Sequence, residues 1–145
     1  MPLHRICERD VDVARPSETV VALATRLHQR NVGCLVVVDE DRRPIGVITD
    51  RDLVIRVLAR GLDPSRTQAE EIMSTELATI DIGASNDGVL EVMRANGVRR
   101  LPVVGEDGRL AGVVSIDDIL VCHADQMVAV GSVLEGEGPR RLAQG

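Results

Sequence analysis

Apolar and polar positions in this chain follow two different periodicities, and the periodicity changes several times. An extended apolar stretch near residues 11–14 comes first. It is followed by Val20, Leu23 and Leu27, which recur at the spacing of one helix face. The pattern therefore predicts a short strand followed by an amphipathic helix.

Two β-branched runs follow, at residues 35–38 and 45–48, with the polar turn DEDRRP between them. Two such runs separated by a short polar segment are typical of a β-hairpin. A second helix is expected to begin directly after the hairpin. Four apolar residues, Leu53, Val54, Val57 and Leu58, are predicted to lie on one face of this helix.

The second half of the chain predicts the same order of elements. Residues 78–82 form the extended stretch, and residues 101–104 and 110–114 form the hairpin around the turn GEDGR. A final helix is expected over residues 116–134. Each half is therefore predicted to fold as strand, helix, strand, strand, helix.

The ends of the first helix in each half carry recognisable signals. Ser17 or Thr19 can cap the helix of the first half, and Ser85 can cap its counterpart. Asn96 and Gly97 form a stop signal, because both residues tolerate the left-handed conformation that ends many helices.

The similarity between the halves extends to individual residues. The repeat offset, which is the spacing between Gly46 and Gly112, aligns the two halves without a gap, and close to half of the aligned hairpin positions are identical. Internal repeats of this kind indicate duplication of one unit. We expect unit one at residues 5–64, unit two at residues 70–132 and a flexible tail at residues 133–145.

The composition restricts how these units can pack. Apolar residues make up 44% of the chain, but none is aromatic, so the core must be aliphatic and a bound base would lie between aliphatic side chains. Each unit has only three strands, and their apolar runs are too continuous for a sheet with one wet face. The two units are therefore expected to pack sheet to sheet around a single fused core.

Charge and chemistry exclude several classes of protein. The net charge of −6 argues against nucleic-acid binding, which needs a basic surface to displace counterions. All 17 basic residues are arginines, so a Schiff-base lysine and the lysine of a phosphate-binding loop are both excluded. We find no signal peptide and no run that approaches the length of a membrane span, which predicts a cytoplasmic protein without a membrane partner.

The cysteines do not form a metal-binding pattern. Cys7, Cys34 and Cys122 contain no CxxC pair, and their odd number is typical of reduced thiols in a cytosolic protein. Cys122 and His123 are adjacent on a predicted helix, where neighbours point about 100° apart and suit one shared ion poorly. We expect no metal site, and we expect Cys34 to be a buried, protonated thiol.

Three stretches carry a family resemblance: CLVVVDEDRRPIGVITDRDL, RRLPVVGEDGRLAGVVSIDDIL and the linking VLARGLDPSRTQAEEIMS. Through them the chain resembles a stand-alone pair of CBS (cystathionine β-synthase) domains. The resemblance covers residues 6–131. It implies an α/β (α+β) fold of two β-α-β-β-α units with pseudo-two-fold symmetry, which usually dimerises into a disc. It also implies a regulatory protein without catalytic activity, which binds an adenosine nucleotide such as AMP, ADP or ATP in clefts between the units and requires no cofactor.

A Gly-x-x-Ser/Thr-x-x-Asp motif occurs once in each unit. Its residues are Gly46, Thr49 and Asp52 in the first unit and Gly112, Ser115 and Asp118 in the second. The hydroxyl lies where a helix should start and can donate to a phosphate oxygen, while the aspartate can accept from a ribose diol. The glycine would let the strand pass close to the ligand. The same spacing also fits an ordinary helix start in which the hydroxyl is only a cap.

Further ligand contacts are implied by the resemblance. Arg99 and Arg100 begin a strand that borders the ligand cleft in the family, and arginine can form paired hydrogen bonds with phosphate. We expect Arg100 to make the site of the second unit the tighter one, unless Arg99 reaches across to the first. Asp12, Val13 and Ala78 are implied to touch the base or the sugar.

Two functions remain open from the sequence alone. The first is a sensor of adenosine nucleotides that forms a homodimer and regulates an unknown protein. The second is a dimerising protein-interaction module whose clefts are vestigial. The residues give no support to an enzyme.

Overall fold

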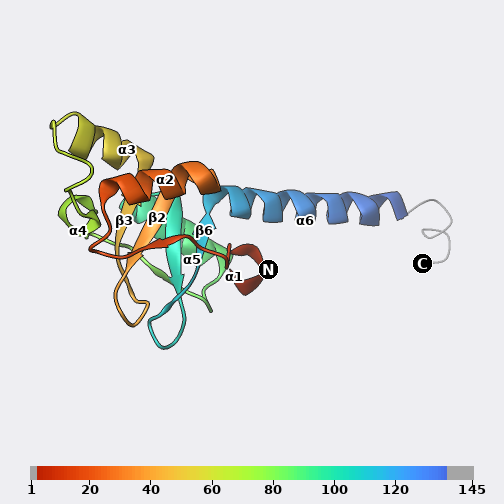
Figure 1. The fold of residues 1–145 in the computed structure, drawn as a ribbon. Coiled ribbons are helices and arrows are strands. Elements are labelled where there is room, and N and C mark those ends of the chain that lie inside the picture. Colours follow the sequence, from red (N-terminus) through yellow and green to blue (C-terminus); the bar gives the residue numbers. More distant parts are fainter. Residues whose placement is uncertain (1–2, 137–145) are drawn as a thin grey trace, which may run out of the picture.

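The computed structural model describes residues 3–136 and shows two sheets, each with three strands (Figure 1). The first half consists of β1 (Val13–Ala14), α2 (Val20–Arg30), β2 (Cys34–Val38), β3 (Pro44–Thr49), α3 (Asp50–Leu53) and the π-helical turn η1 (Val54–Leu58). The second half consists of β4 (Ile80–Asp81), α5 (Asn86–Asn96), β5 (Arg100–Val104), β6 (Leu110–Ser115) and α6 (Ile116–Gly136). Short helices α1 (Leu3–Ile6) and α4 (Ala69–Ile72) precede the two halves. The predicted order of elements is therefore confirmed.

The two sheets have the same topology and the same register. The first strand of each sheet runs parallel to the second, and the second and third form an antiparallel hairpin. Val37 pairs with Gly46 in the first hairpin, and Val103 pairs with Gly112 in the second. A register shift follows Val37 and Val103 alike, so the repeat offset holds in three dimensions.

Side-chain caps fix the helices that the sequence predicted. The Thr19 hydroxyl accepts a hydrogen bond from the Ala22 N–H at 3.3 Å, so Thr19 and not Ser17 is the cap of α2. The Ser85 hydroxyl accepts from the Gly88 N–H at 3.1 Å and begins α5. Gly97 ends α5 with φ of 63°, as the stop signal predicted.

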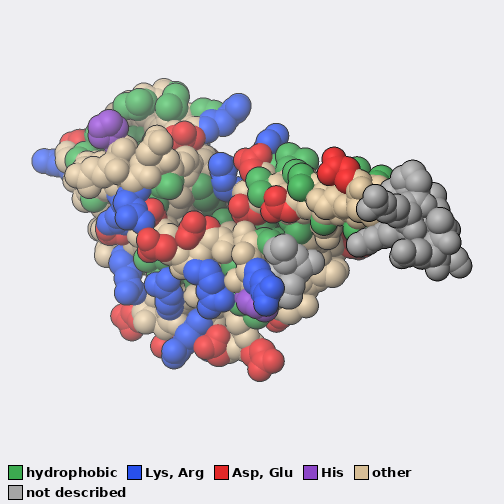
Figure 2. All heavy atoms as spheres, turned by 90° about the vertical axis from the view of Figure 1, so that its right-hand side faces the viewer, with side chains coloured by type: hydrophobic (Ala, Val, Ile, Leu, Met, Phe, Trp, Pro, Cys, Tyr) green, Lys and Arg blue, Asp and Glu red, His purple; other side chains and the backbone are tan. Residues whose placement is uncertain are grey.

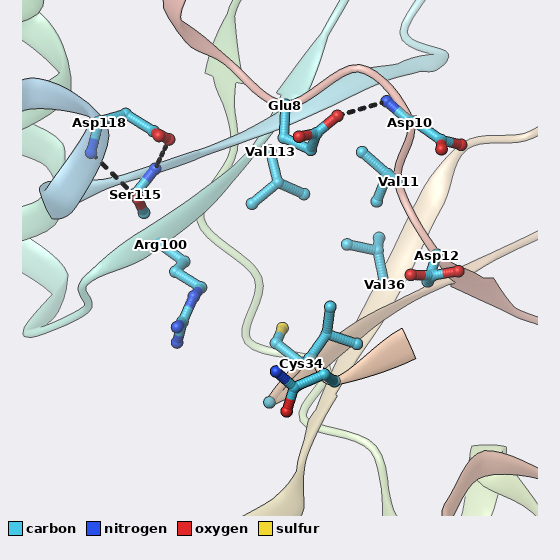
Figure 3. Close-up of a pocket in the computed structure, with 13 residues that line it drawn as sticks. Glu8, Asp10, Val11, Asp12, Cys34, Val36, Arg100, Val113, Ser115 and Asp118 are labelled. Carbon is cyan, nitrogen blue, oxygen red and sulfur yellow. Dashed lines mark hydrogen bonds between the residues drawn. The ribbon is translucent and has the colours of Figure 1, made fainter. Parts of the chain in front are cut away.

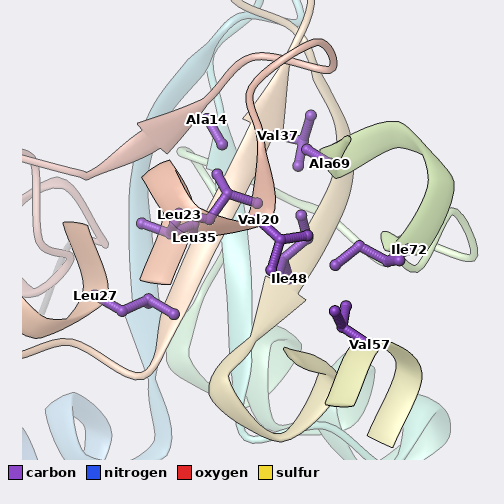
Figure 4. Close-up of a cluster of buried hydrophobic side chains, with 10 residues drawn as sticks. All are labelled: Ala14, Val20, Leu23, Leu27, Leu35, Val37, Ile48, Val57, Ala69 and Ile72. Carbon is purple, nitrogen blue, oxygen red and sulfur yellow. The ribbon is translucent and has the colours of Figure 1, made fainter. Parts of the chain in front are cut away.

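The core is divided, which corrects the expectation of a single fused core. One aliphatic cluster fills the first unit, a second fills the other unit, and a third, smaller cluster joins the two (Figure 4 shows the first). Each unit buries one sheet face under helices. The third cluster is built around Val36, Val38 and Leu110, so residues of both sheets contribute to it.

The two short leading helices are exchanged between the units. Leu3 of α1 is fully buried in the core of the second unit, and Ile72 of α4 is buried in the core of the first. Directly after each helix, the backbone pairs with the last strand of that unit. Glu8 and Val113 exchange two hydrogen bonds of 2.8 and 2.9 Å, and Ser74 pairs with Val47 in the same way. The predicted unit boundaries therefore stay a proposal, because each core takes residues from the sequence of the other half.

The last helix of each unit leaves most of its apolar residues exposed. In the first unit Val57 is buried, whereas Val54 and Leu58, predicted for the same apolar face, are 55% and 66% exposed. Helix α6 buries Ile119 and Cys122 and then projects from the body of the molecule (Figure 1). The predicted flexible tail thus begins as helix at residues 133–136, and residues 137–145 lie outside the described part of the chain.

Helix α6 also corrects an expectation about length. By length and composition alone it is long and apolar enough to cross a membrane, although no run was predicted to approach that length. A single helix of this kind is weak evidence for a membrane span. Its exposed apolar side chains nevertheless need a partner of some kind to cover them.

Candidate functional site

Two clefts lie between the units, and each contains one copy of the motif. The Ser115 cleft has a volume of about 300 Å³, and the Thr49 cleft has a volume of about 280 Å³. The Ser115 cleft is lined by Glu8, Asp10, Val11, Asp12, Asn31, Val32, Gly33, Cys34, Val36, Arg100, Val113, Ser115 and Asp118. The Thr49 cleft is lined by Val47, Thr49, Asp52, Ser74, Glu76, Leu77, Ala78, Val98, Arg100 and Pro102.

The hydroxyl and the carboxylate of each motif bond to each other's backbone. The Ser115 N–H donates to Asp118 Oδ2 at 2.8 Å, and the Asp118 N–H donates to Ser115 Oγ at 3.2 Å (Figure 3). Thr49 and Asp52 form the same pair of bonds at 2.9 and 3.2 Å. This arrangement is a capping box, so the motif begins a helix in both units.

The capping box leaves part of each side chain free for a ligand. The hydroxyl accepts a backbone hydrogen bond but keeps its own proton to donate. The carboxylate uses one oxygen on the backbone. In Asp118 the structure gives the second oxygen no hydrogen bond, and in Asp52 it lies 3.7 Å from Arg56 Nε. The motif can therefore cap a helix and still contact a sugar or a phosphate.

Arg100 lines both clefts, whereas Arg99 lines neither. Arg100 begins β5 opposite Ser115 in the hairpin register, and its side chain extends away from Ser115 and Asp118 (Figure 3). Arg99 lies instead in an open hollow beside α5 with Ile116, whose N–H donates to the Arg99 carbonyl oxygen at 2.8 Å. Successive residues of a strand point to opposite faces, which explains why only one of the two arginines reaches the clefts.

The resemblance implied three further ligand contacts, at Asp12, Val13 and Ala78, and the structure places these residues differently. Asp12 lines the Ser115 cleft and forms an ion pair of 2.9 Å with Arg30 Nε. Ala78 lines the Thr49 cleft. Val13 lines neither cleft, and its side chain packs against the cluster that joins the two sheets.

Gly46 and Gly112 make room for the protein chain and not for a ligand, which corrects their predicted role. A Cβ atom on Gly46 would lie 2.5 Å from Met73 Sδ. A Cβ atom on Gly112 would lie 2.6 Å from the carbonyl oxygen of Glu8. Both glycines therefore allow the exchanged leading segment to pass over the sheet.

Several lining residues were missed by sequence reasoning. Glu8 and Ser74 reach the clefts only because the leading segments cross to the opposite unit. Asp10 and Glu76 follow on the same segments. The repeat offset relates Glu8 to Ser74 and Asp10 to Glu76, so the repeat could have paired them once one of each pair was known.

Cys34 lies on the wall of the Ser115 cleft and is half-buried, although the sequence predicted a buried residue. Burial raises the pKa of its thiol to about 11, and the nearby guanidinium of Arg100 opposes that rise only in part. The thiol is therefore protonated at neutral pH, as predicted.

Within residues 3–136, no group of three or more His, Cys, Asp or Glu side chains could hold a metal ion. The three cysteines are free thiols. The absence of stoichiometric metal remains a prediction for elemental analysis of the purified protein.

Comparison with known proteins gives consistent matches. A family model described as CBS domain matches residues 3–59 and 69–124. An uncharacterised protein of Methanopyrus kandleri is 38% identical over 115 residues, which is 79% of this chain and 59% of that protein. Hypoxic response protein 1 of Mycobacterium tuberculosis is 40% identical over 102 residues, covering 70% of this chain and 71% of that protein.

Solved structures give the same result. A crystal structure of hypoxic response protein I with two coordinated zinc ions has a TM-score of 0.76 and 36% identity, and the match covers 83% of this chain and 97% of that one. The cytosolic domain of the Mg²⁺ channel MgtE in complex with ATP has a TM-score of 0.68 and 30% identity, over 79% of this chain and 45% of that one.

Proposed function

This chain belongs to the CBS-domain family, with one copy of the domain in each half, and from that premise we propose that it is a non-catalytic regulatory module that binds an adenosine nucleotide. The observation that supports the proposal most directly is the pair of clefts, each lined by a capping box with a free hydroxyl proton. The MgtE cytosolic domain, a structural neighbour, has been solved with ATP.

The chemistry of the clefts suits a nucleoside phosphate. Unpaired N–H groups at the start of a helix favour phosphate, and the motif lies at the start of α6 in one unit and α3 in the other. Each motif carboxylate can accept from a ribose hydroxyl. Aliphatic residues such as Leu77 and Pro102 offer a surface for the base in a chain without aromatic residues.

A ligand screen tests this proposal. AMP, ADP, ATP and adenosine are added separately, and the melting temperature is followed by calorimetry or a dye, because the chain lacks Trp and Tyr. A ligand that binds only the folded state raises the melting temperature with its concentration. No shift with any of the four compounds at millimolar concentration would contradict nucleotide binding.

One observation favours the alternative of an interaction module with vestigial clefts. The capping boxes give the motif residues a complete structural role without any ligand. If the screen shows no shift while the protein still dimerises, this alternative is the better account.

We also propose a homodimer formed through the exposed helices. The repeat offset places Val54 and Ile55 of η1 in the positions of Leu120 and Val121 of α6, and all four are at least 47% exposed. Figure 2 shows apolar and acidic side chains next to each other on the part of the molecule that projects. Seven exposed apolar residues of α6 offer on the order of 700 Å², which approaches the ~800 Å² per partner of a standard interface.

A second copy fits α6 better than a lipid surface does. The sequence of α6 contains four acidic residues and no arginine or lysine. Helices that lie on anionic membranes carry basic residues on their polar face, so this helix lacks the attraction such a surface needs. A cytoplasmic location, with an unidentified regulated protein as a further partner, belongs to the same proposal.

A further inference from the structure

The two clefts are built from equivalent positions but carry different charges. The repeat offset relates Glu8 of the Ser115 cleft to Ser74 of the Thr49 cleft, and it relates Asp12 to Ala78. At both positions the Ser115 cleft has a carboxylate where the Thr49 cleft has a neutral side chain. Each cleft also has the aspartate of its own motif.

Burial decides which of these charges matter. The Asp12 side chain is 17% exposed, so its charge is screened less by water and salt than that of Asp10, which is 88% exposed. Arg30 pairs with Asp12, but Arg30 lines the adjoining hollow and not the cleft. The Ser115 cleft therefore presents two partly buried carboxylates, Asp12 and Asp118, to any ligand.

The distribution of positive charge adds to this difference. Among the described residues that line the two clefts, Arg100 is the one cation. Its side chain extends away from Ser115 and Asp118 (Figure 3), and it also lines the Thr49 cleft. The guanidinium is thus available to a phosphate in either cleft, but in the Thr49 cleft no carboxylate occupies the position of Asp12.

We infer that the Thr49 cleft takes the nucleoside phosphate and that the Ser115 cleft takes an adenosine compound without negative charge. This inference rests on the proposed nucleotide-binding function and assigns its two sites. The sequence predicted that the Ser115 cleft binds the nucleotide more tightly, because Arg100 belongs to the second unit. The inference reverses that ranking, because Arg100 lines both clefts whereas Glu8 and Asp12 line only the Ser115 cleft.

Titration calorimetry with AMP tests the assignment in the full-length protein. Wild type is expected to bind one AMP per chain, and Asp52→Asn, in the Thr49 cleft, is expected to abolish that binding. The double variant Glu8→Ser, Asp12→Ala gives the Ser115 cleft the residues of the other cleft. It is expected to tighten AMP binding there at least about tenfold, which raises the stoichiometry to two, because two negative charges that line the cleft are gone.

Two further variants, and adenosine binding by Asp52→Asn, control the experiment. Glu40→Ser, Asp41→Ala removes the same two charge types from the exposed hairpin turn and should leave one AMP per chain. Asp12→Asn alone preserves the size of the side chain and should give a smaller gain of the same kind. Asp52→Asn should still bind adenosine, because the Ser115 cleft is unchanged in that variant.

The outcomes separate the inference from the proposed function. Two AMP molecules of similar affinity per wild-type chain, full AMP binding by Asp52→Asn, or no gain in the double variant would each overturn the inference and leave nucleotide binding standing. Loss of adenosine binding in Asp52→Asn would overturn the assignment of the Ser115 cleft. No binding of AMP, ADP, ATP or adenosine by any of the proteins would overturn the proposed function itself.

Discussion

Gly46 and Gly112 occupy equivalent positions, but alanine would meet a different obstacle at each. At Gly46 the new methyl group would contact the Met73 side chain, which can change rotamer. At Gly112 it would contact the carbonyl oxygen of Glu8, a residue whose backbone N–H and carbonyl each form one hydrogen bond with Val113. We expect Gly112→Ala to lower the free energy of unfolding by about 1–3 kcal/mol and Gly46→Ala to lower it by less.

Urea denaturation of the two variants and of wild type measures this difference. Gly131→Ala is the control, because a Cβ atom at Gly131 in α6 meets no atom within 4 Å. Equal losses at Gly46 and Gly112 would contradict the role of the backbone contact.

A partly buried ion pair predicts how stability depends on pH. The Arg26 guanidinium, which hydrogen-bonds both carboxylate oxygens of Glu18, lowers the pKa of that carboxyl. A lowered pKa in the folded state means that the pair adds stability above the ordinary glutamate pKa and that this stability is lost as the pH falls below it. We expect Glu18→Gln to cost about 1 kcal/mol at pH 7, a figure that allows for partial exposure of the pair.

Thermal denaturation between pH 3 and 7 checks this prediction. The difference in melting temperature between wild type and Glu18→Gln should shrink as the pH falls below about 4.5. A difference that stays constant over this range would show that the charge of Glu18 contributes nothing.

At the scale of single residues, the sequence predicted the motif but not the whole site. Ser115 and Asp118 were identified because the same motif occurs at the equivalent positions of the first unit. The structure places both residues in one cleft. Arg99 and Val13 line neither cleft, and periodicity does not say which face of a strand borders a cleft, so their contact with a ligand stays a prediction. Glu8 was missed because its segment crosses to the other unit.

At the scale of elements, α6 makes the clearest prediction. Leu120, Met127 and Leu134 recur at a heptad spacing, which places them along one side of the helix, and each is at least 59% exposed. We expect Met127→Glu to weaken the proposed dimer at least about tenfold, because a buried unpaired charge costs more than the ~1.4 kcal/mol that corresponds to this factor.

Sedimentation velocity over a range of protein concentrations gives the dissociation constant. Ser132→Glu is the matched control, since it introduces the same charge into the same helix at a position outside the apolar series. A monomeric wild type at micromolar concentration, or equal effects of the two variants, would refute an interface along this side of α6.

Periodicity predicted the elements well and their burial less well. The hairpins and the helix caps follow from local rules, so Ser85 and Gly97 could be assigned from the sequence, and the cap of α2 could be narrowed to Ser17 or Thr19. The sequence predicted one apolar face for the helix after Thr49, and two residues of that face, Val54 and Leu58, are exposed. Periodicity shows that a face needs covering and does not say whether the same chain or another one covers it.

At the scale of the whole molecule, the exchanged leading helices make each unit depend on the other. Leu3 is fully buried in the second unit, although it precedes the first. We expect Leu3→Ala to cost about 2–5 kcal/mol, as truncation of a buried leucine usually does. Arg5→Ala, an exposed change in the same helix, should stay within about 0.5 kcal/mol.

Calorimetry of Leu3→Ala also tests whether the units unfold together. A single transition, with equal calorimetric and van't Hoff enthalpies, is expected in the variant as in wild type. Two separate transitions would show that the exchange does not couple the units.

The exchange of leading helices also bears on how such a chain can arise. In a protein of half this length, the leading helix would leave the sheet of its own chain uncovered, and two copies would have to trade helices to bury them. After duplication and fusion, the exchanged helices make their contacts within one polypeptide. The covalent link between the halves then holds them together at any protein concentration. Each half is then free to change alone, and the pairs Glu8 with Ser74 and Asp12 with Ala78 show this divergence in two clefts that began as one.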